Sequence, residues 1–172
     1  NFSVRRDLYA KAYGGEGTIT IETSGNVNYY YGTAGGNAVP YQTFNMTSPL
    51  TAGVWTHLAI VRDLTNMKLR WYKDGVLVNE TATLYASATA SSLTAYIGTG
   101  YTNPFYGSMD EVSVWSRALV QTEISQLYNS GSGMELPPAP LPDCSGTVVA
   151  YDGAGTSHID TGLTSGQLYT YR

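Results

Sequence analysis

The sequence is poor in cysteine, in charge and in long apolar segments. Cys144 is its only cysteine, which excludes an internal disulfide and a zinc site built from cysteines alone. No apolar run approaches the ~20 residues that are needed to span a bilayer. Charged residues make up 13% of the chain and the formal net charge is −4, which argues against a nucleic-acid or anionic-membrane surface. We therefore expect no nucleic-acid partner and no insertion into a membrane.

The residues that are plentiful favour an all-β protein. The chain holds 19 glycines and 15 tyrosines, and threonine and serine are also frequent. This composition is more typical of an extracellular β module than of a cytosolic enzyme. The length of 172 residues suffices for one hydrophobic core and a second small unit.

Alternating apolar and polar residues predict a series of short antiparallel strands. Residues 54–62 are apolar on both faces, which favours a central strand of a sandwich. Asp74-Gly75 lies between two strand patterns and predicts a tight hairpin. The predicted strands are 8–13, 18–22, 27–31, 40–48, 54–62, 67–72, 76–78 and 94–99.

The most informative stretch is 105–128, FYGSMDEVSVWSRALVQTEISQLY. Its alternation predicts a strand over 109–115. Thr122 is a candidate N-cap for a short helix, because its hydroxyl can accept an otherwise unpaired backbone N–H. The residues at 129–131, Asn-Ser-Gly, favour the end of that helix.

The same stretch resembles the closing segment of the laminin G-like, concanavalin A-like jelly rolls. In that family a strand of the form F-x-G-x-(apolar)-D-E-V precedes R-A-L and a helix that ends in L-Y. The segments W-T-H-L-A and W-Y-K-D-G-V-L-V resemble the middle of the family. For residues 1–133 the resemblance implies an antiparallel jelly-roll β-sandwich with one short helix. The matching residues of the closing segment are Phe105, Gly107, Met109, Asp110, Glu111, Val112, Arg117, Ala118, Leu119, Glu123, Ile124, Leu127 and Tyr128.

Two further segments follow the predicted jelly roll. Residues 134–142, MELPPAPLP, contain four prolines and predict a semi-rigid linker. Residues 143–172 resemble part of an Ig-like, fibronectin type III domain, through V-V-x-Y-D-G and D-T-G-L-x-x-G-x-x-Y-x-Y. About 30 residues cannot form a seven-stranded sandwich of ~100 residues, so this segment is expected to be a partial domain.

Asp110 is the candidate metal ligand. In calcium-bearing relatives the Asp of D-E-V supplies a carboxylate to a structural Ca²⁺, and backbone carbonyls complete the shell. The resemblance therefore implies a structural Ca²⁺ at Asp110. On the predicted strand Asp110 shares a face with valines, where a bare carboxylate is costly without a partner. The alternative is that Asp110 pairs with Arg117 or caps backbone N–H groups.

Tyrosines are the candidate ligand-binding residues. Sugars expose C–H faces that stack on aromatic rings. Tyr101 follows glycine and precedes polar residues, which favours a loop ring that is open to a ligand. Asn103, Tyr106 and Tyr30 complete the predicted ligand-binding set. The alternative for the strand aromatics is core packing, which we favour for Tyr29, Tyr31 and Trp115.

The sequence gives little support to catalysis. Glycosidases need two carboxylates at ~5–9 Å, and those on this scaffold carry them as E-x-D-x-E on one strand. The chain has no such run, and the adjacent Asp110 and Glu111 point to opposite faces of the predicted strand. It also lacks a nucleophile elbow, a P-loop and a zinc-type His cluster. We expect a non-enzymatic protein.

The sequence therefore predicts an extracellular or cell-surface binding and adhesion module of a larger modular protein, which recognises a glycan or surface ligand through rim loops. Two alternatives remain. One is a structural spacer or filament subunit that self-associates by strand exchange, because the opening strands of the resemblance look shortened and an open edge recruits a donor strand. Residues 145–172 are a candidate donor. The other is an accessory domain of a secreted glycan-degrading enzyme.

Overall fold

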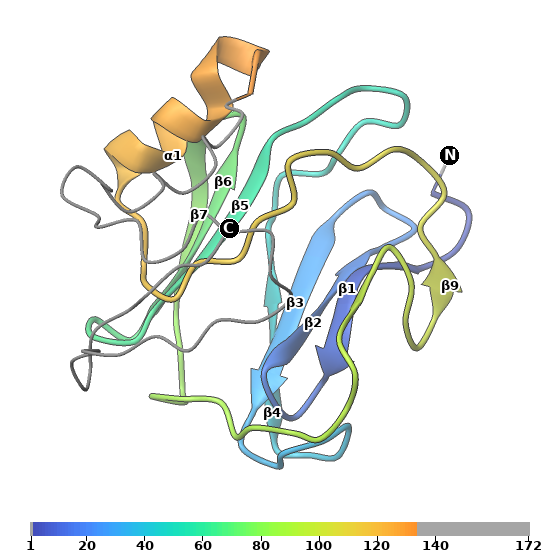
Figure 1. The fold of residues 1–172 in the computed structure, drawn as a ribbon, viewed down its shortest axis with the longest axis vertical. Coiled ribbons are helices and arrows are strands. Elements are labelled where there is room, and N and C mark those ends of the chain that lie inside the picture. The colour runs from blue at the N-terminus through green and yellow to red at the C-terminus, as the bar shows by residue number, and fades with distance from the viewer. Residues whose placement is uncertain (1, 134–172) are drawn as a thin grey trace, which may run out of the picture. The chain divides into compact units, whose positions relative to one another are not determined.

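Two β-sheets face each other in the part of the protein that the computed structural model describes, residues 2–133 (Figure 1). Sheet A joins β1 parallel to β9, and its other pairs are antiparallel. Sheet B is an antiparallel meander. The prediction of an all-β sandwich with one short helix is confirmed. In spatial order sheet A contains β4 (Tyr41–Asn45), β3 (Val27–Gly32), β2 (Gly17–Ile21), β1 (Arg6–Ala12) and β8 (Tyr96–Ile97), with β9 (Asn103–Pro104) also on β1, and sheet B contains β5 (Leu58–Asp63), β6 (Lys68–Lys73) and β7 (Val76–Ala82).

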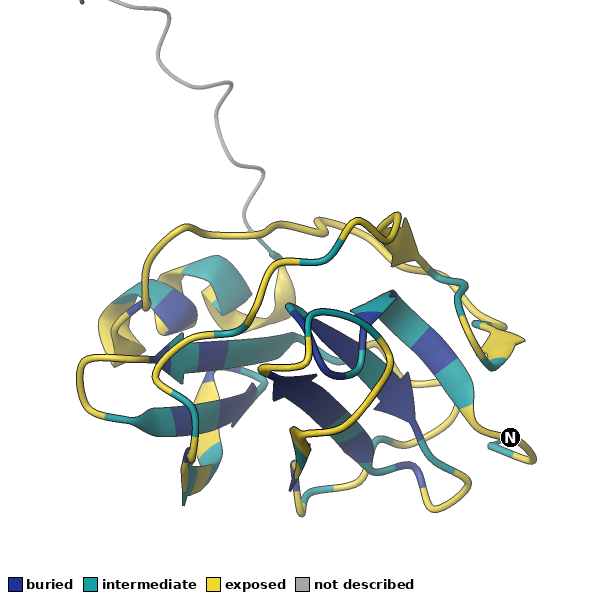
Figure 2. Ribbon diagram, turned by 90° about the horizontal axis from the view of Figure 1, so that it is seen from below, coloured by how far each residue is buried: buried dark blue, intermediate teal, exposed yellow. Residues whose placement is uncertain are grey.

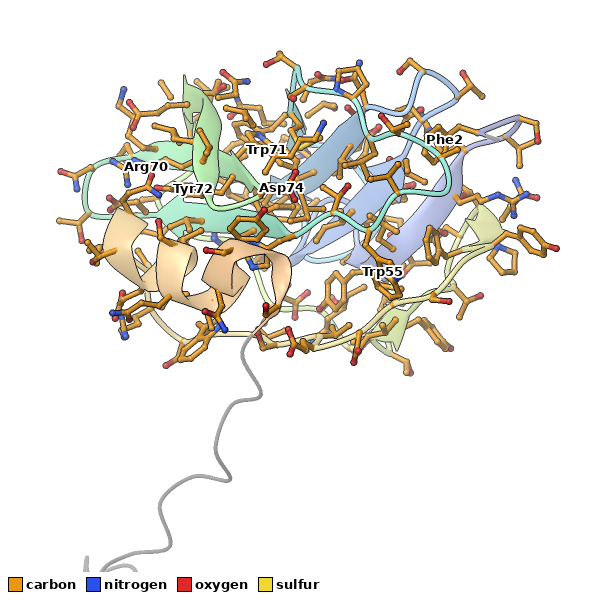
Figure 3. All side chains as sticks on the ribbon, turned by 90° about the horizontal axis from the view of Figure 1, so that it is seen from above. Phe2, Trp55, Arg70, Trp71, Tyr72 and Asp74 are labelled. Carbon is orange, nitrogen blue, oxygen red and sulfur yellow. The ribbon has the colours of Figure 1, made fainter. Side chains whose placement is uncertain are left out.

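The main core lies between the two sheets. Alternation along β3 sends Tyr29 and Tyr31 inward, where Tyr31 stacks on Phe44 with ring centroids 5.4 Å apart. From sheet B the indole of Trp71 enters the same core, whereas Tyr72 lies on the α1 side of β6 (Figure 3). Core packing of Tyr29 and Tyr31 was predicted and is confirmed. The buried residues of this core are Ile21, Val27, Tyr29, Tyr31, Phe44, Met46, Leu69 and Trp71.

The predicted hairpin between β6 and β7 is confirmed. Asp74 and Gly75 both have positive φ, at 50° and 74°. This conformation matches the twist of two antiparallel strands and favours Asp-Gly. The Asp74 carboxylate also accepts the backbone N–H of His57 at 3.0 Å, which ties the hairpin to the segment before β5.

The helix α1 (Gln121–Tyr128) covers the outer face of sheet B (Figure 1). Ile124 is fully buried and packs with Val61 and Tyr72. The predicted N-cap Thr122 is wrong, because the cap is Val120, whose backbone N–H donates to the Glu123 carboxylate at 2.9 Å. The C-terminal boundary is as predicted.

At that boundary Asn129 takes the left-handed conformation with φ 46° and begins the short 3₁₀ turn η1 (Asn129–Gly131).

The predicted strand over 109–115 is wrong. This segment lies exposed between β9 and α1, in no β-ladder of the described residues, and its Glu111 has a positive φ of 51° (Figure 2). Val114 is 86% exposed and Trp115 41% exposed, so the predicted core packing of Trp115 is also wrong. Alternation shows that a segment can form a strand, but a strand also needs a neighbour to complete its hydrogen bonds.

The predicted strand over 54–62 is shorter and lies elsewhere in its sheet than expected. β5 begins at Leu58, and Val54 and Trp55 lie in the preceding loop, 60% and 69% exposed (Figure 3). Among the described residues β5 pairs with β6 alone, so it is an edge strand rather than a central one. Its two apolar faces instead contact the main core and α1.

The predicted linker 134–142 and the fibronectin-like segment 143–172 lie outside the described residues.

Candidate functional site

The face of sheet A that points away from the main core carries the candidate site. We call it the outer face. Because Tyr29 and Tyr31 point inward, Tyr30 between them points to this face. The register of β2, β3 and β4 then places two rows of paired residues on the same face. These rows are Thr18, Tyr30 and Thr43, and Thr20, Asn28 and Asn45.

Four tyrosines gather on the outer face around Tyr13, which directly follows β1. The Tyr13 ring centroid lies 4.8 Å from that of Tyr30, 6.0 Å from that of Tyr41 and 5.7 Å from that of Tyr101. Tyr30 and Tyr41 are in edge contact at 6.1 Å. These spacings are typical of interacting aromatic pairs. We call Tyr13, Tyr30, Tyr41 and Tyr101 the tyrosine cluster.

The cluster has a buried base and an exposed rim. Tyr30 is 6% exposed, whereas Tyr41 and Tyr101 are 37% and 41% exposed. The pKa of Tyr13 is raised to about 12, mainly by burial and further by the negative charge of Asp7. The Tyr13 hydroxyl is therefore neutral at physiological pH and can both donate and accept a hydrogen bond.

A polar network centred on Glu22 lies beside the cluster. The Glu22 Oε2 atom accepts from the Arg5 Nε atom at 2.8 Å, and Oε1 accepts from the Thr20 hydroxyl at 2.6 Å and from the Asn28 amide at 3.3 Å. The Asn28 amide also donates to the Tyr30 hydroxyl at 3.2 Å, which joins the network to the cluster. Asn45 donates to Asn28 Oδ1 at 2.8 Å. We call these residues the Glu22 network.

The loop between β8 and β9 is held over β1 by Asp7. This carboxylate is 0% exposed and accepts the backbone N–H of Thr102 at 2.6 Å. The Tyr101 hydroxyl donates to the Lys11 carbonyl, so the loop contacts β1 at two points. The second Asp7 oxygen and the Thr102 hydroxyl are buried without a hydrogen-bond partner among the described residues. Asp7 therefore fixes the position of Tyr101.

A small pocket opens at this loop. It has a volume of about 260 Å³ and is lined by Tyr96, Thr99, Gly100 and Tyr101. The volume is near the lower end of the range for small-molecule sites. Tyr101 belongs both to this pocket and to the tyrosine cluster.

The structure brings two of the four predicted ligand-binding residues together. Tyr30 and Tyr101 meet through Tyr13, although the buried ring of Tyr30 can contact a ligand only through its neighbours. Asn103 lies at β9, where its amide donates to the Arg5 carbonyl at 3.1 Å. Tyr106 is 88% exposed, and the Arg6 guanidinium lies 5.8 Å from its ring centroid. Asn103 and Tyr106 therefore lie along the loop, outside the cluster.

Asp110 lies in the exposed segment after β9, not on an apolar face as the sequence predicted. Its Oδ1 atom accepts the backbone N–H of Glu111 at 2.9 Å, while Arg117 pairs with Glu123 at 2.5 Å. No group of three His, Cys, Asp or Glu side chains within residues 2–133 could hold a metal ion. Ca²⁺ prefers six to eight oxygens, so the Asp110 carboxylate alone could supply only a small part of its shell. Calcium binding at Asp110 stays a prediction.

The sequence analysis missed Tyr13, Tyr41, Arg5, Glu22 and Asn28. The signal for Asn28 was present, since it occupies a polar position of a strand whose apolar positions face the core, and Glu22 directly follows such a strand. Tyr13 and Tyr41 carry no such signal. Their meeting depends on the pairing of β3 with β4 and on the course of the chain after β1.

Three solved structures have a similar fold at low sequence identity. The CBM40 module of the Ruminococcus gnavus IT-sialidase, also solved with α2,3 sialyllactose, has a TM-score of 0.56 at 17% identity, with 74% of this chain and 76% of that chain covered. A Bacteroides ovatus protein described as a candidate carbohydrate-binding protein has a TM-score of 0.53 at 23% identity, with 73% and 40% covered.

The third is botulinum neurotoxin type C, whose cell entry depends on two ganglioside molecules. It has a TM-score of 0.52 at 12% identity, with 74% and 31% covered. The present chain thus spans less than half of the Bacteroides and toxin chains. At these identities the likeness concerns the fold. No curated protein matches the sequence.

The sequence itself matches one family profile over residues 3–125. The match includes both sheets and most of α1, and so it takes in the tyrosine cluster and the Glu22 network. The chain belongs to the concanavalin A-like lectin/glucanases superfamily.

Proposed function

We propose that this domain is a non-catalytic glycan-binding module of a larger extracellular or cell-surface protein, and that the outer face of sheet A is its site. The observation that carries the proposal is the tyrosine cluster beside the Glu22 network. Exposed rings of Tyr41 and Tyr101 offer stacking surfaces for the C–H faces of a sugar. The adjacent amides and the Arg5–Glu22 pair offer donors and acceptors for its hydroxyls.

The two carboxylates of the outer face support binding rather than hydrolysis. Glu22 holds three hydrogen bonds from its neighbours, and Asp7 is 0% exposed beneath the loop. A glycosidase needs one carboxyl group poised as an acid and another that reaches the sugar or a water molecule. Neither carboxylate is free for these roles. The solved structures of similar fold that bind carbohydrate or depend on gangliosides also support a binding module.

A glycan array with the whole chain tests this proposal. We expect Tyr101→Ala and Tyr41→Ala each to weaken binding about fivefold, because stacking of a sugar on one ring contributes on the order of 1 kcal/mol. Trp55→Ala is the matched control, since Trp55 is an exposed aromatic residue that contacts neither the cluster nor the network. Tyr106→Ala shows whether the site continues along the loop. Equal losses in the cluster and control variants would overturn the assignment of the site.

Self-association is a second candidate function, favoured by the exposed segment between β9 and α1. Val112 and Val114 are 51% and 86% exposed in a segment that no described strand pairs. Such a segment can add to the edge of a sheet in another copy of the chain.

Sedimentation velocity over a hundredfold concentration range tests this candidate. Val114→Lys should reduce association, whereas Val76→Lys, at a 62% exposed position on β7, should not. A monomer at every concentration would remove this candidate.

A further inference from the structure

The charges of the outer face also indicate which sugars it takes. We propose that the site selects uncharged sugars over sugars that carry a carboxylate, and that Glu22 sets this preference. The inference rests on the proposed glycan-binding function and deepens it by naming the ligand class.

Arg5 is the cation of the Glu22 network, and Glu22 already compensates its charge. Their side chains are 43% and 19% exposed and pair at 2.8 Å. The hydrogen bond that Arg5 donates to Glu22 raises the pKa of Arg5 above its ordinary value. A ligand carboxylate on the Arg5 guanidinium would lie beside the Glu22 carboxylate, which already accepts from the Arg5 Nε atom. Two like charges at such close range disfavour each other, so Glu22 opposes a second carboxylate.

The other cations near this face are engaged as well. The Lys11 ammonium pairs with Glu16 at 2.7 Å, and the Arg6 guanidinium donates to the Pro104 carbonyl at 2.7 Å. The buried Asp7 carboxyl group beneath the loop takes part in no ion pair within residues 2–133. A ligand carboxylate near Glu22 would therefore find Lys11 already paired with Glu16, and Arg6 bonded to the Pro104 carbonyl.

The same groups suit hydroxyls. A hydroxyl group both donates and accepts a hydrogen bond. The Arg5–Glu22 pair presents N–H donors beside a carboxylate acceptor, and Asn28 and Asn45 add amides next to it. Such a pair binds a neutral hydroxyl without losing its internal charge compensation.

Paired glycans test the inference. Lactose, α2,3 sialyllactose and further glycan pairs with and without sialic acid are measured with the whole chain at 150 mM salt, a condition that limits long-range charge effects. We expect each uncharged member to bind at least tenfold more tightly than its sialylated partner. In Glu22→Gln the freed Arg5 should accept a carboxylate, so the ratio should shift at least tenfold toward the sialylated member.

Glu80→Gln is the matched control for charge. Glu80 also pairs with an arginine, Arg70, at 2.7 Å, but it lies on β7 in sheet B. Both substitutions change the net charge by the same amount, so only Glu22→Gln should shift the ratio. Arg5→Gln is the second variant should Glu22→Gln fail to fold. It should weaken uncharged glycans without any gain for sialylated ones.

The outcomes separate the inference from the function on which it rests. Tighter binding of sialylated glycans by the unaltered chain, or an equal shift in the Glu22→Gln and Glu80→Gln variants, would overturn the preference and leave glycan binding in place. Binding of no glycan at all would overturn both.

Discussion

Gly100 is the position at which one methyl group should disturb the candidate site most directly. A Cβ atom there would overlap the Ala10 methyl group and lie 2.7 Å from Asp7 Oδ2. Neither the Ala10 methyl group nor the Asp7 carboxylate can move aside easily, because Ala10 belongs to β1 and Asp7 accepts a hydrogen bond from Thr102. The loop must therefore move away from the sheet when Gly100 is replaced by alanine.

Overpacking of this kind costs about 1–3 kcal/mol. For a folded unit of this size, about 2 kcal/mol lowers the melting temperature by roughly 6–10 °C. Tyr101 follows Gly100 directly, so Gly100→Ala should also weaken glycan binding. Circular dichroism melting and the glycan array measure the two effects on the same preparation.

Gly36→Ala is the matched control, because a Cβ atom at Gly36 would meet no atom within 4 Å. It should leave stability unchanged or raise it by about 0.4–1 kcal/mol through the lower entropy of the unfolded chain. If Gly100→Ala melts like Gly36→Ala, the close packing of the loop on β1 is wrong and the account of how Tyr101 is positioned fails with it.

Three further predictions concern the core, the pH dependence and the metal. Trp71→Ala should lower the free energy of unfolding by about 3–5 kcal/mol in urea titrations, because Trp71 is 0% exposed in the main core, and a loss below 1 kcal/mol would contradict that placement. Burial opposes ionisation of Glu16, but hydrogen bonds from Lys11 and Ser91 lower its pKa to about 2 from 4.5. The contribution of Glu16 to stability should therefore be present above pH 4.5 and disappear as the pH falls towards 2. Glu16→Gln should remove this part of the acid destabilisation, and an unchanged pH profile of stability would exclude the role. Calcium at Asp110 predicts a melting temperature that is higher in excess Ca²⁺ than in EDTA and a difference that Asp110→Ala removes, whereas identical curves would exclude the site.

The sequence predicted the local features of the fold well. The Asp74-Gly75 turn and the inward rings of Tyr29 and Tyr31 follow from backbone preference and alternation, which are properties of neighbouring residues. The strand over 109–115 failed because strand formation depends on a partner elsewhere in the chain. The placement of Trp55 in the strand 54–62 was wrong for a related reason, since an apolar residue next to a strand is buried only if another element covers it.

The candidate site was predictable only in part. Tyr101 was identified from its loop surroundings, and Tyr30 from the tyrosine run of β3. Their connection through Tyr13 depends on the loop crossing β1, which no local pattern encodes. The Glu22 network needed the register of β2 against β3, because only that pairing brings Asn28 to the carboxylate.

The hydrogen bond from Thr102 to Asp7 joins residues 95 positions apart. Closing a chain segment of that length costs on the order of 4 kcal/mol in the length-dependent part of its entropy. The contact of Tyr101 with Tyr13 thus depends on a long-range closure, and an unfolded chain displays no complete binding surface. Any ligand that contacts both Tyr13 and Tyr101 would stabilise the closed loop. It would slow hydrogen exchange of the Thr102 amide by the same factor by which it stabilises that loop.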